Sequence, residues 1–203
     1  SDGLYGCGSF SNGLTTILDC EGVDACPSLV YTNDSDGIFD ICNETAATLA
    51  VAVLNGSTAD IIWRDGQGNI IATGVSVINT DLLTNTTSCN PVVYNYTAEL
   101  TENPDDNCPA VSLPFVVKVY PDISAPAITN TSANGCTVSI NTCSSFLISY
   151  PGDGGQVFTG SANVEVNADS PNPLPFTIVN PDAPAGCNLG QTVTVSFNCP
   201  VGG

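Results

Sequence analysis

Histidine is absent from this chain, and its only cationic side chains are Arg64 and Lys118. Without histidine, the usual general base near neutral pH, every Ser-His-Asp or Cys-His pair and a common zinc ligand are missing. The 20 acidic residues therefore leave a formal charge of −18. Such a surface repels nucleic acid and anionic membranes, so we expect neither as a partner.

Long apolar runs are also absent. The most continuous run covers residues 49–54, whereas a membrane-spanning helix needs about 18 apolar residues. We therefore expect no membrane insertion. The opening Ser1-Asp2-Gly3 has no basic region followed by an apolar one, from which we expect either a signal already removed or a segment of a longer polypeptide.

Catalytic constellations are equally scarce. Two carboxylates can hydrolyse a glycoside, but no pair stands out among the 20, and few aromatic platforms accompany them. Ser9 stands in a Gly-x-Ser setting without the strand–turn–helix context of a nucleophile elbow. The sequence therefore indicates a protein that is not an enzyme.

Cysteine, in contrast, is abundant and even in number. The ten positions are Cys7, Cys20, Cys26, Cys42, Cys89, Cys108, Cys136, Cys143, Cys187 and Cys199. No Cys-x-x-Cys motif occurs, so neither zinc nor thioredoxin-like chemistry is favoured. The remaining interpretation is a set of disulfides formed in an oxidising compartment, which places the protein outside the cell or at its surface.

The acidic residues are spread along the chain, which is typical of a solvated, self-repelling surface; binding of divalent cations is the alternative. The best cation candidate is Asp34, Asp36 and Asp40 around Gly37, which resembles part of a calcium loop. A plain polar turn explains the same residues, because the closing glutamate and flanking helices of an EF-hand are missing. Residues 102–107 form a weaker candidate. Calcium is the one cofactor that the sequence raises.

Period-2 segments rich in Val, Ile, Thr and Tyr alternate with Gly, Pro, Asn and Asp clusters. The predicted strands cover residues 28–32, 47–54, 59–63, 69–73, 92–100, 113–120, 126–131, 136–141, 145–150, 156–159, 162–167, 175–179 and 191–198. This spacing predicts an all-β fold of tandem Ig-like, Greek-key β-sandwiches stapled by disulfides. Residues 65–69 and 153–155 supply hairpin turns.

Three regions follow from this pattern. Residues 26–121 and 122–203 each form a sandwich, joined at the proline-containing segment 120–126, where proline stops a strand and stiffens the joint. Residues 1–25 are a disulfide-closed extension or the end of a preceding module.

Trp63 lies on a predicted strand directly after Ile61 and Ile62. A tryptophan packed beside an intersheet disulfide is typical of an Ig sandwich, and Cys42 stands near the preceding strand. The alternative is an exposed platform for a sugar ring. Because apolar residues precede it and no second aromatic accompanies it, we predict that Trp63 belongs to the core.

Strand direction favours particular cysteine pairs. In a Greek-key sandwich it favours Cys42 with Cys89 and Cys26 with Cys108. Cys7 and Cys20 then pair locally, and the remaining four pair among themselves in one of three ways, since sequence alone does not fix connectivity.

Six Asn-x-Ser/Thr sequons fit exposure outside the cell, although a chain rich in Asn and Thr also produces sequons by chance. They begin at Asn33, Asn43, Asn55, Asn85, Asn95 and Asn130.

A family resemblance covers residues 26–121. It is carried by Cys42 before residues 48–51, by residues 61–65, 68–71 and 94–97, by Cys108, and by the closing strand 115–121. This pattern resembles the Ig-like repeats that stand in tandem along giant surface proteins of gliding and filamentous bacteria. Residues 122–203 share only the strand rhythm and the terminal strand 191–197. The resemblance implies roles in adhesion, motility or surface filaments.

The sequence therefore predicts a non-catalytic structural repeat of an extracellular filament or adhesin. Its partners would be copies of itself and surface glycans. The alternative is a carbohydrate- or receptor-binding module at an adhesin tip, which an exposed aromatic patch would favour.

Overall fold

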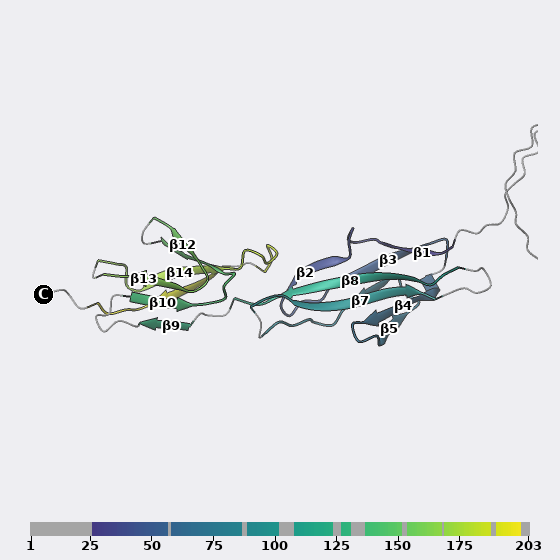
Figure 1. The fold of residues 1–203 in the computed structure, drawn as a ribbon, viewed down its shortest axis with the longest axis horizontal. Helices are drawn as coiled ribbons and strands as arrows, with labels where there is room; N and C mark the ends of the chain where they lie inside the picture. The colour runs from purple at the N-terminus through teal and green to yellow at the C-terminus, as the bar shows by residue number, and fades with distance from the viewer. Residues whose placement is uncertain are drawn as a thin grey trace, which may run out of the picture.

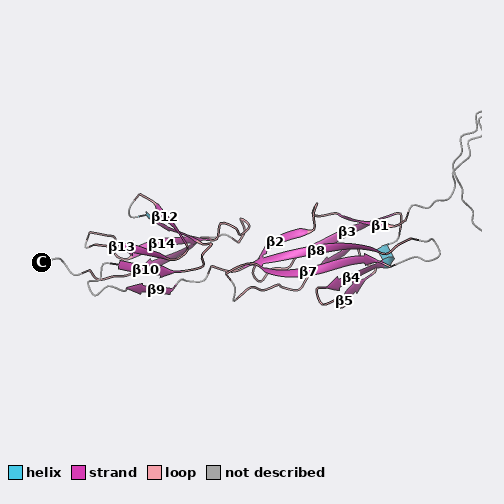
Figure 2. Cartoon of the chain, viewed as in Figure 1, coloured by secondary structure: helices cyan, strands magenta, loops and turns pink. Residues whose placement is uncertain are grey.

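The computed structural model describes residues 26–199 except 57, 87–88, 102–107, 124–126, 131–136, 152–153, 168 and 188–189. Two β-sandwiches lie end to end along the long axis of the molecule (Figure 1). Strands joined by loops and turns build both of them (Figure 2). The extension 1–25, with Cys7 and Cys20, lies outside the described residues, as do Cys136 and residues 102–107.

The first sandwich packs a three-stranded sheet against a five-stranded one. The strand orders are β1-β3-β6 and β2-β8-β7-β4-β5. The bounds are β1 Ser28–Tyr31, β2 Ile38–Cys42, β3 Thr48–Leu54, β4 Ile61–Asp65, β5 Ile70–Thr73, β6 Val77–Asn79, β7 Val92–Leu100 and β8 Val111–Tyr120, with a 3-10 turn over Thr58–Asp60 before β4. Neighbouring strands pair antiparallel except β2, which runs parallel to β8. The chain thus changes sheets between β1 and β2.

The second sandwich repeats this arrangement among its described residues. Its sheets have the orders β13-β10-β9 and β12-β11-β14-β15, and all its strand pairs are antiparallel. The bounds are β9 Ala127–Asn130, β10 Thr137–Asn141, β11 Leu147–Tyr150, β12 Gln156–Thr159, β13 Ala162–Glu165, β14 Leu174–Val179 and β15 Gln191–Val195. The all-β, disulfide-stapled Ig-like fold expected from the strand rhythm is therefore correct.

Each sandwich has its own hydrophobic core. In the first, Trp63 is fully buried, its ring centroid lies 5.3 Å from that of Phe115, and its Nε1 donates a 2.8 Å hydrogen bond to the carbonyl of Val75. Tyr31 and Phe39 pack on the same phenylalanine. A buried indole with its N–H paired satisfies both its apolar surface and its donor.

The second core is built around Phe146 and Phe176, with Tyr150 next to the latter at 5.4 Å between centroids. Alternation explains the burial, because every second residue of β14 faces inward. In the described part of the chain, no helix is long and apolar enough to cross a membrane.

Two strands were not predicted. β2 covers residues that were interpreted as the end of a calcium loop, and β6 is only three residues long. A three-residue strand gives too little alternation to be recognised, and the carboxylates before β2 obscured its pattern of Ile38, Phe39 and Ile41.

Candidate functional site

The joint between the two sandwiches gathers strand ends and cysteines. Cys42, the last residue of β2, pairs in register with Tyr120 of β8, and Val92 of β7 pairs with Val119, so these strands reach the same end. Cys89 stands just before β7 and belongs to this end too. On the other side, Cys143 lies between β10 and β11, and Cys187 lies between β14 and β15.

Two disulfides cross this joint. Cys42 bonds to Cys187 with 5.1 Å between Cα atoms, and Cys89 bonds to Cys143 with 5.5 Å between them. Both distances are ordinary for disulfides. Together with the chain segment 121–126, they make three covalent connections between the sandwiches. Each added connection restricts how far one sandwich can rotate relative to the other.

The predicted pairing of Cys42 with Cys89 is therefore wrong, and so is the prediction that Cys143 and Cys187 pair within the second sandwich. That reasoning assumed that each cysteine finds its partner inside its own domain. The predicted bond of Cys26 to Cys108 is present, with 5.4 Å between Cα atoms. The neighbour of Trp63 in the core is Phe115, and the Cys42–Cys89 disulfide that was expected near the tryptophan is not formed.

Asparagine side chains fasten the backbone at the same end. The Asn43 amide donates to the Asp122 carboxylate at 2.7 Å, and its oxygen accepts the backbone N–H of Asn85. The Asn85 amide in turn donates to the carbonyls of Asn90 and Val119, both at 2.8 Å. Asn43 and Asn85 are buried, and their side-chain amides make hydrogen bonds within the fold. A glycan attached to either amide would break these hydrogen bonds.

The other sequons have different surroundings. The Asn33 amide donates to the carbonyl of Thr48, Asn55 is exposed at a φ of 57°, and Asn95 is exposed on β7. The Asn130 side chain lies outside the described residues.

The linker itself is packed. Pro121 is buried, and Ile123 packs against the hydrophobic core of the second sandwich. Asp122, between them, holds Asn43 of the first sandwich. The segment 121–123 thus contacts both sides of the joint.

Tyr120 lies at the joint, and its environment shifts its ionisation. Burial raises the pKa of the Tyr120 phenol, and the carboxylates of Asp40, to which it donates a hydrogen bond, and Asp182 raise this pKa further. Asp40 belongs to the first sandwich and Asp182 to the second, so carboxylates of both sandwiches raise the pKa of this phenol.

Alkaline solution is therefore expected to destabilise the protein. A phenol whose pKa is raised by folding stabilises the native state below its unfolded pKa of about 10, and this contribution is lost as the pH rises through the higher folded value. We expect the wild-type melting temperature to fall above pH 10 and the fall to be smaller in Tyr120→Phe. Melting curves at pH 7 and at alkaline pH measure this; equal falls in the two proteins would show that Tyr120 does not contribute.

The predicted calcium residues form a turn and the strand that follows it. Asp34 accepts the N–H of Asp36, and Asp36 accepts the N–H of Ile38 at 3.0 Å. The backbone N–H of Asp36, together with a side-chain hydrogen bond from the same residue, holds the pKa of the Asp34 carboxyl below its ordinary value. Gly37 has a φ of 71°. Across the described residues no three carboxylate, thiol or imidazole groups gather as metal ligands, and Asp40 instead faces Tyr120.

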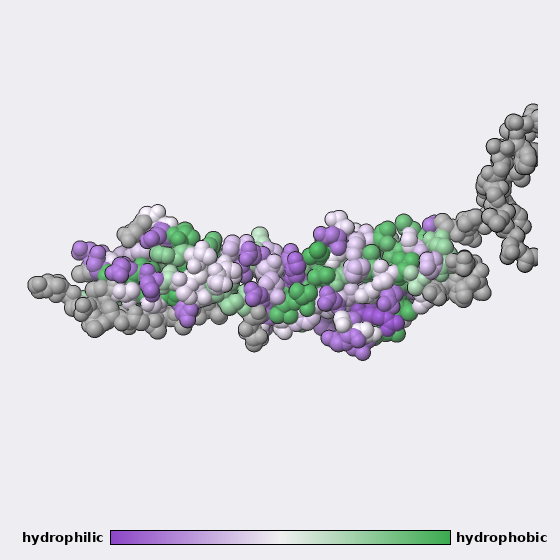
Figure 3. Space-filling view, viewed as in Figure 1, coloured by the Kyte–Doolittle hydropathy of each residue, from purple (hydrophilic) through white to green (hydrophobic). Residues whose placement is uncertain are grey.

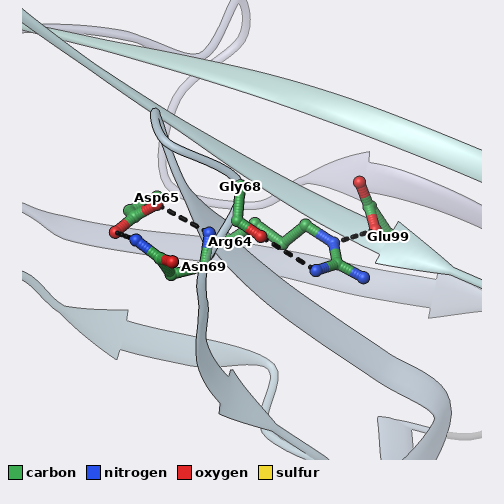
Figure 4. Close-up of polar contacts among 5 residues, drawn as sticks. All are labelled: Arg64, Asp65, Gly68, Asn69 and Glu99. Carbon is green, nitrogen blue, oxygen red and sulfur yellow. Dashed lines mark hydrogen bonds and ion pairs between the residues drawn. The ribbon is translucent and has the colours of Figure 1, made fainter.

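A second cluster of polar side chains lies in the first sandwich, at the β4–β5 hairpin (Figure 4). Asp65 accepts the N–H groups of Gln67 and Asn69, both at 2.9 Å, and the Asn69 amide. These bonds lower the pKa of the Asp65 carboxyl. Gly68 completes the turn at a φ of 85°, as expected for a glycine hairpin.

Arg64, on β4 of this hairpin, links the turn to the neighbouring strand β7. Its Nε lies 2.7 Å from a Glu99 carboxylate oxygen, and its Nη1 donates to the carbonyl of Gly68 at 3.0 Å (Figure 4). The hairpin borders a groove of about 760 Å³. Hydrophilic residues gather over the β4–β5 end of this sandwich, beside hydrophobic residues over β7 and β8 (Figure 3).

Comparison with solved structures supports the fold. The crystal structure of bovine butyrophilin matches with a TM-score of 0.50 at 12% identity, covering 86% of this chain and all of that one. The SGBP-B protein of a Bacteroides ovatus mixed-linkage glucan utilisation locus, in complex with a mixed-linkage heptasaccharide, aligns at a TM-score of 0.25 and 14% identity. That alignment covers 79% of this chain but only 41% of the other.

No protein-family model matches the chain, and no curated protein matches its sequence. The established description is thus structural: disulfide-rich, Ig-like β-sandwiches. Several disulfides indicate an oxidising environment, which is extracellular or secretory.

Proposed function

We propose that this chain is a stiff structural segment of an extracellular cell-surface filament or adhesin and that it has no catalytic role. The observation that carries the proposal is the joint closed by Cys42–Cys187 and Cys89–Cys143. A binding domain that acts alone has no need of a fixed orientation toward its neighbour. A segment that transmits position or force along a filament does.

The surface is consistent with such a role. Tandem modules contact mainly their neighbours, so length can be added without a new core. The formal charge of −18 opposes nonspecific clumping, and lateral contacts between copies would have to be local. Copies of the same chain are the proposed partners, joined through local contacts that are either apolar or bridged by cations.

Negative-stain electron microscopy tests the proposal in two ways. We expect native surface material to contain filaments or straight rods. We also expect the purified chain to appear as two globules with a narrow spread of angles between them. A variant with Cys42→Ser, Cys89→Ser, Cys143→Ser and Cys187→Ser should show a broad spread, because only the linker remains. Cys26→Ser with Cys108→Ser, which removes a disulfide within the first sandwich, is the matched control.

Two results would contradict the proposal. One is native material made only of separate monomers at high concentration. The other is an angular spread in the wild-type chain as broad as that of the four-cysteine variant.

A further inference from the structure

The groove beside the β4–β5 hairpin is lined by both apolar and polar side chains, and the proposed structural role assigns it no function. It lies between the edge strands of the two sheets, β5 and β6, with β7 behind them. Four of the ten large apolar side chains that are exposed in the described part of the chain line it: Ile71, Val75, Val77 and Val93. Exposed apolar residues scattered singly need no explanation, but a group of them around one concavity does.

Tyrosines and polar groups complete the lining. Tyr94 and Tyr96, which follow one another on the same face of β7, are half-buried against the first core. The Tyr94 hydroxyl donates to the carbonyl of Thr84 at 2.9 Å, so that ring is fixed. Among the described residues, the Tyr96 hydroxyl and the Asp81 carboxylate have no hydrogen-bond partner. They remain available for a ligand.

The charges of the groove decide which ligands it accepts. Asp65 and Asp81 are the charged residues of its lining, and no lysine or arginine is among them. Arg64 lies nearby, but its guanidinium is bonded to Glu99 and Gly68. Burial raises the pKa of the Tyr96 phenol, and Tyr94 and both aspartates raise it further, which reflects the same negative field. Anionic ligands are therefore repelled.

An extended peptide is a poorer fit than a compact ligand. Strand addition needs a long, regular sheet edge, whereas β6 has three residues and the β4–β5 pairing shifts register between Trp63 and Arg64. The groove volume falls within the range of roughly 300–1,000 Å³ that is usual for small-molecule sites. Apolar walls, two tyrosine rings and separate hydrogen-bonding groups match a molecule with apolar faces and hydroxyl edges.

We propose that this groove binds a neutral oligosaccharide, with Tyr94, Tyr96, Ile71 and Val77 against the sugar faces and Asp81 with the Tyr96 hydroxyl on the sugar hydroxyls. The Asp65 hairpin forms a wall that is rigid before binding, because its carboxylate and the Arg64 guanidinium are already used within the turn. A site that needs no ordering on binding retains more of its interaction free energy. The inference goes beyond the proposed structural role and does not depend on it.

Calorimetry with defined sugars tests the site. The probes are cellohexaose, laminarihexaose, mannohexaose and chitohexaose as neutral ligands, and hexagalacturonate as an anionic one. The chain is produced in a host without asparagine glycosylation, which keeps Asn95 at the groove unmodified. We expect at least one neutral hexasaccharide to bind with a Kd below 1 mM and hexagalacturonate not to bind.

Two conservative variants locate the binding. Asp81→Asn and Tyr96→Phe each remove one ligand-facing hydrogen-bonding group and should weaken binding about tenfold, the usual effect of losing a bond to a charged or buried partner. Asp169→Asn is the matched control, because it removes the same charge from an exposed position in the second sandwich. All three should melt as the wild type does.

The proposal is overturned if none of the neutral sugars binds, if hexagalacturonate binds as well as they do, or if Asp81→Asn and Tyr96→Phe bind like the control. A cationic (Lys-Val)₅ peptide that binds more tightly than every sugar, and weakens in Asp81→Asn, would assign the groove to a protein partner and also overturn it. Any of these results leaves the straightness of the particles, and therefore the structural role, unaffected.

Discussion

Pulled from its two ends, the oxidised chain is expected to lengthen by less than about 100 Å between Cys26 and Cys199. The reason is that the Cys42–Cys187 disulfide connects the two ends through a short covalent path. From Cys26 the chain runs through β1 and β2 to Cys42, crosses by disulfide to Cys187, and continues through β15 to Cys199. This path has only about 28 residue steps, each of which spans at most about 3.6 Å when extended.

The rest of both sandwiches lies outside that path. Force applied at the ends therefore cannot stretch the long segment between Cys42 and Cys187, which are 145 residues apart in sequence. After reduction the same ends are separated by about 173 residue steps, so full extension approaches about 600 Å. The difference is several-fold and does not depend on how strongly either sandwich resists unfolding.

Single-molecule force spectroscopy measures this difference directly. Cys26→Ser with Cys108→Ser is the control, because it removes a disulfide but leaves the short path intact; its extension when oxidised should equal that of the wild type. The comparison is made between Cys26 and Cys199, with the handles attached beside these two positions. An oxidised wild-type chain that extends by several hundred ångströms would disprove the bond between Cys42 and Cys187.

The joint also shows where sequence reasoning ends. Strand direction correctly related Cys26 to Cys108, because both lie at one end of one sandwich. The same reasoning failed for Cys42, because nothing in a single sequence says that a strand end faces another domain. The available signal was that Cys42 and Cys89 both lie at the end of the first sandwich where the linker begins. That end must meet whatever follows.

The groove was missed for a different reason. From the sequence, Tyr94 and Tyr96 were placed on a strand and within the family resemblance, but not in a site. The other residues of the groove include Val75, from the β5–β6 connection, and Asp81, which follows β6. Alternation identifies which side of a strand is buried but not which strands leave a gap. Conversely, local patterns were sufficient for the hairpin at residues 65–69, where aspartate and glycine specify the turn themselves.

Replacing Trp63 by alanine is expected to destabilise the first sandwich by about 3–5 kcal/mol. Trp63 is fully buried against Phe115, so its loss leaves a large cavity that the surrounding sheets cannot fill. It also removes the hydrogen bond from the indole N–H to the partly buried carbonyl of Val75. Few single substitutions in this core could remove more contacts.

Urea unfolding followed by circular dichroism measures this effect without relying on the tryptophan's own fluorescence. Trp63→Phe keeps an aromatic ring and loses the hydrogen bond, so its destabilisation should be smaller than that of Trp63→Ala. Val157→Ala, at a side chain that is 57% exposed on β12, should change the free energy of unfolding by less than about 0.5 kcal/mol. If Trp63→Ala kept wild-type stability but lost binding to a sugar, the tryptophan would be a ligand platform, contrary to its buried position between Phe115 and Val75.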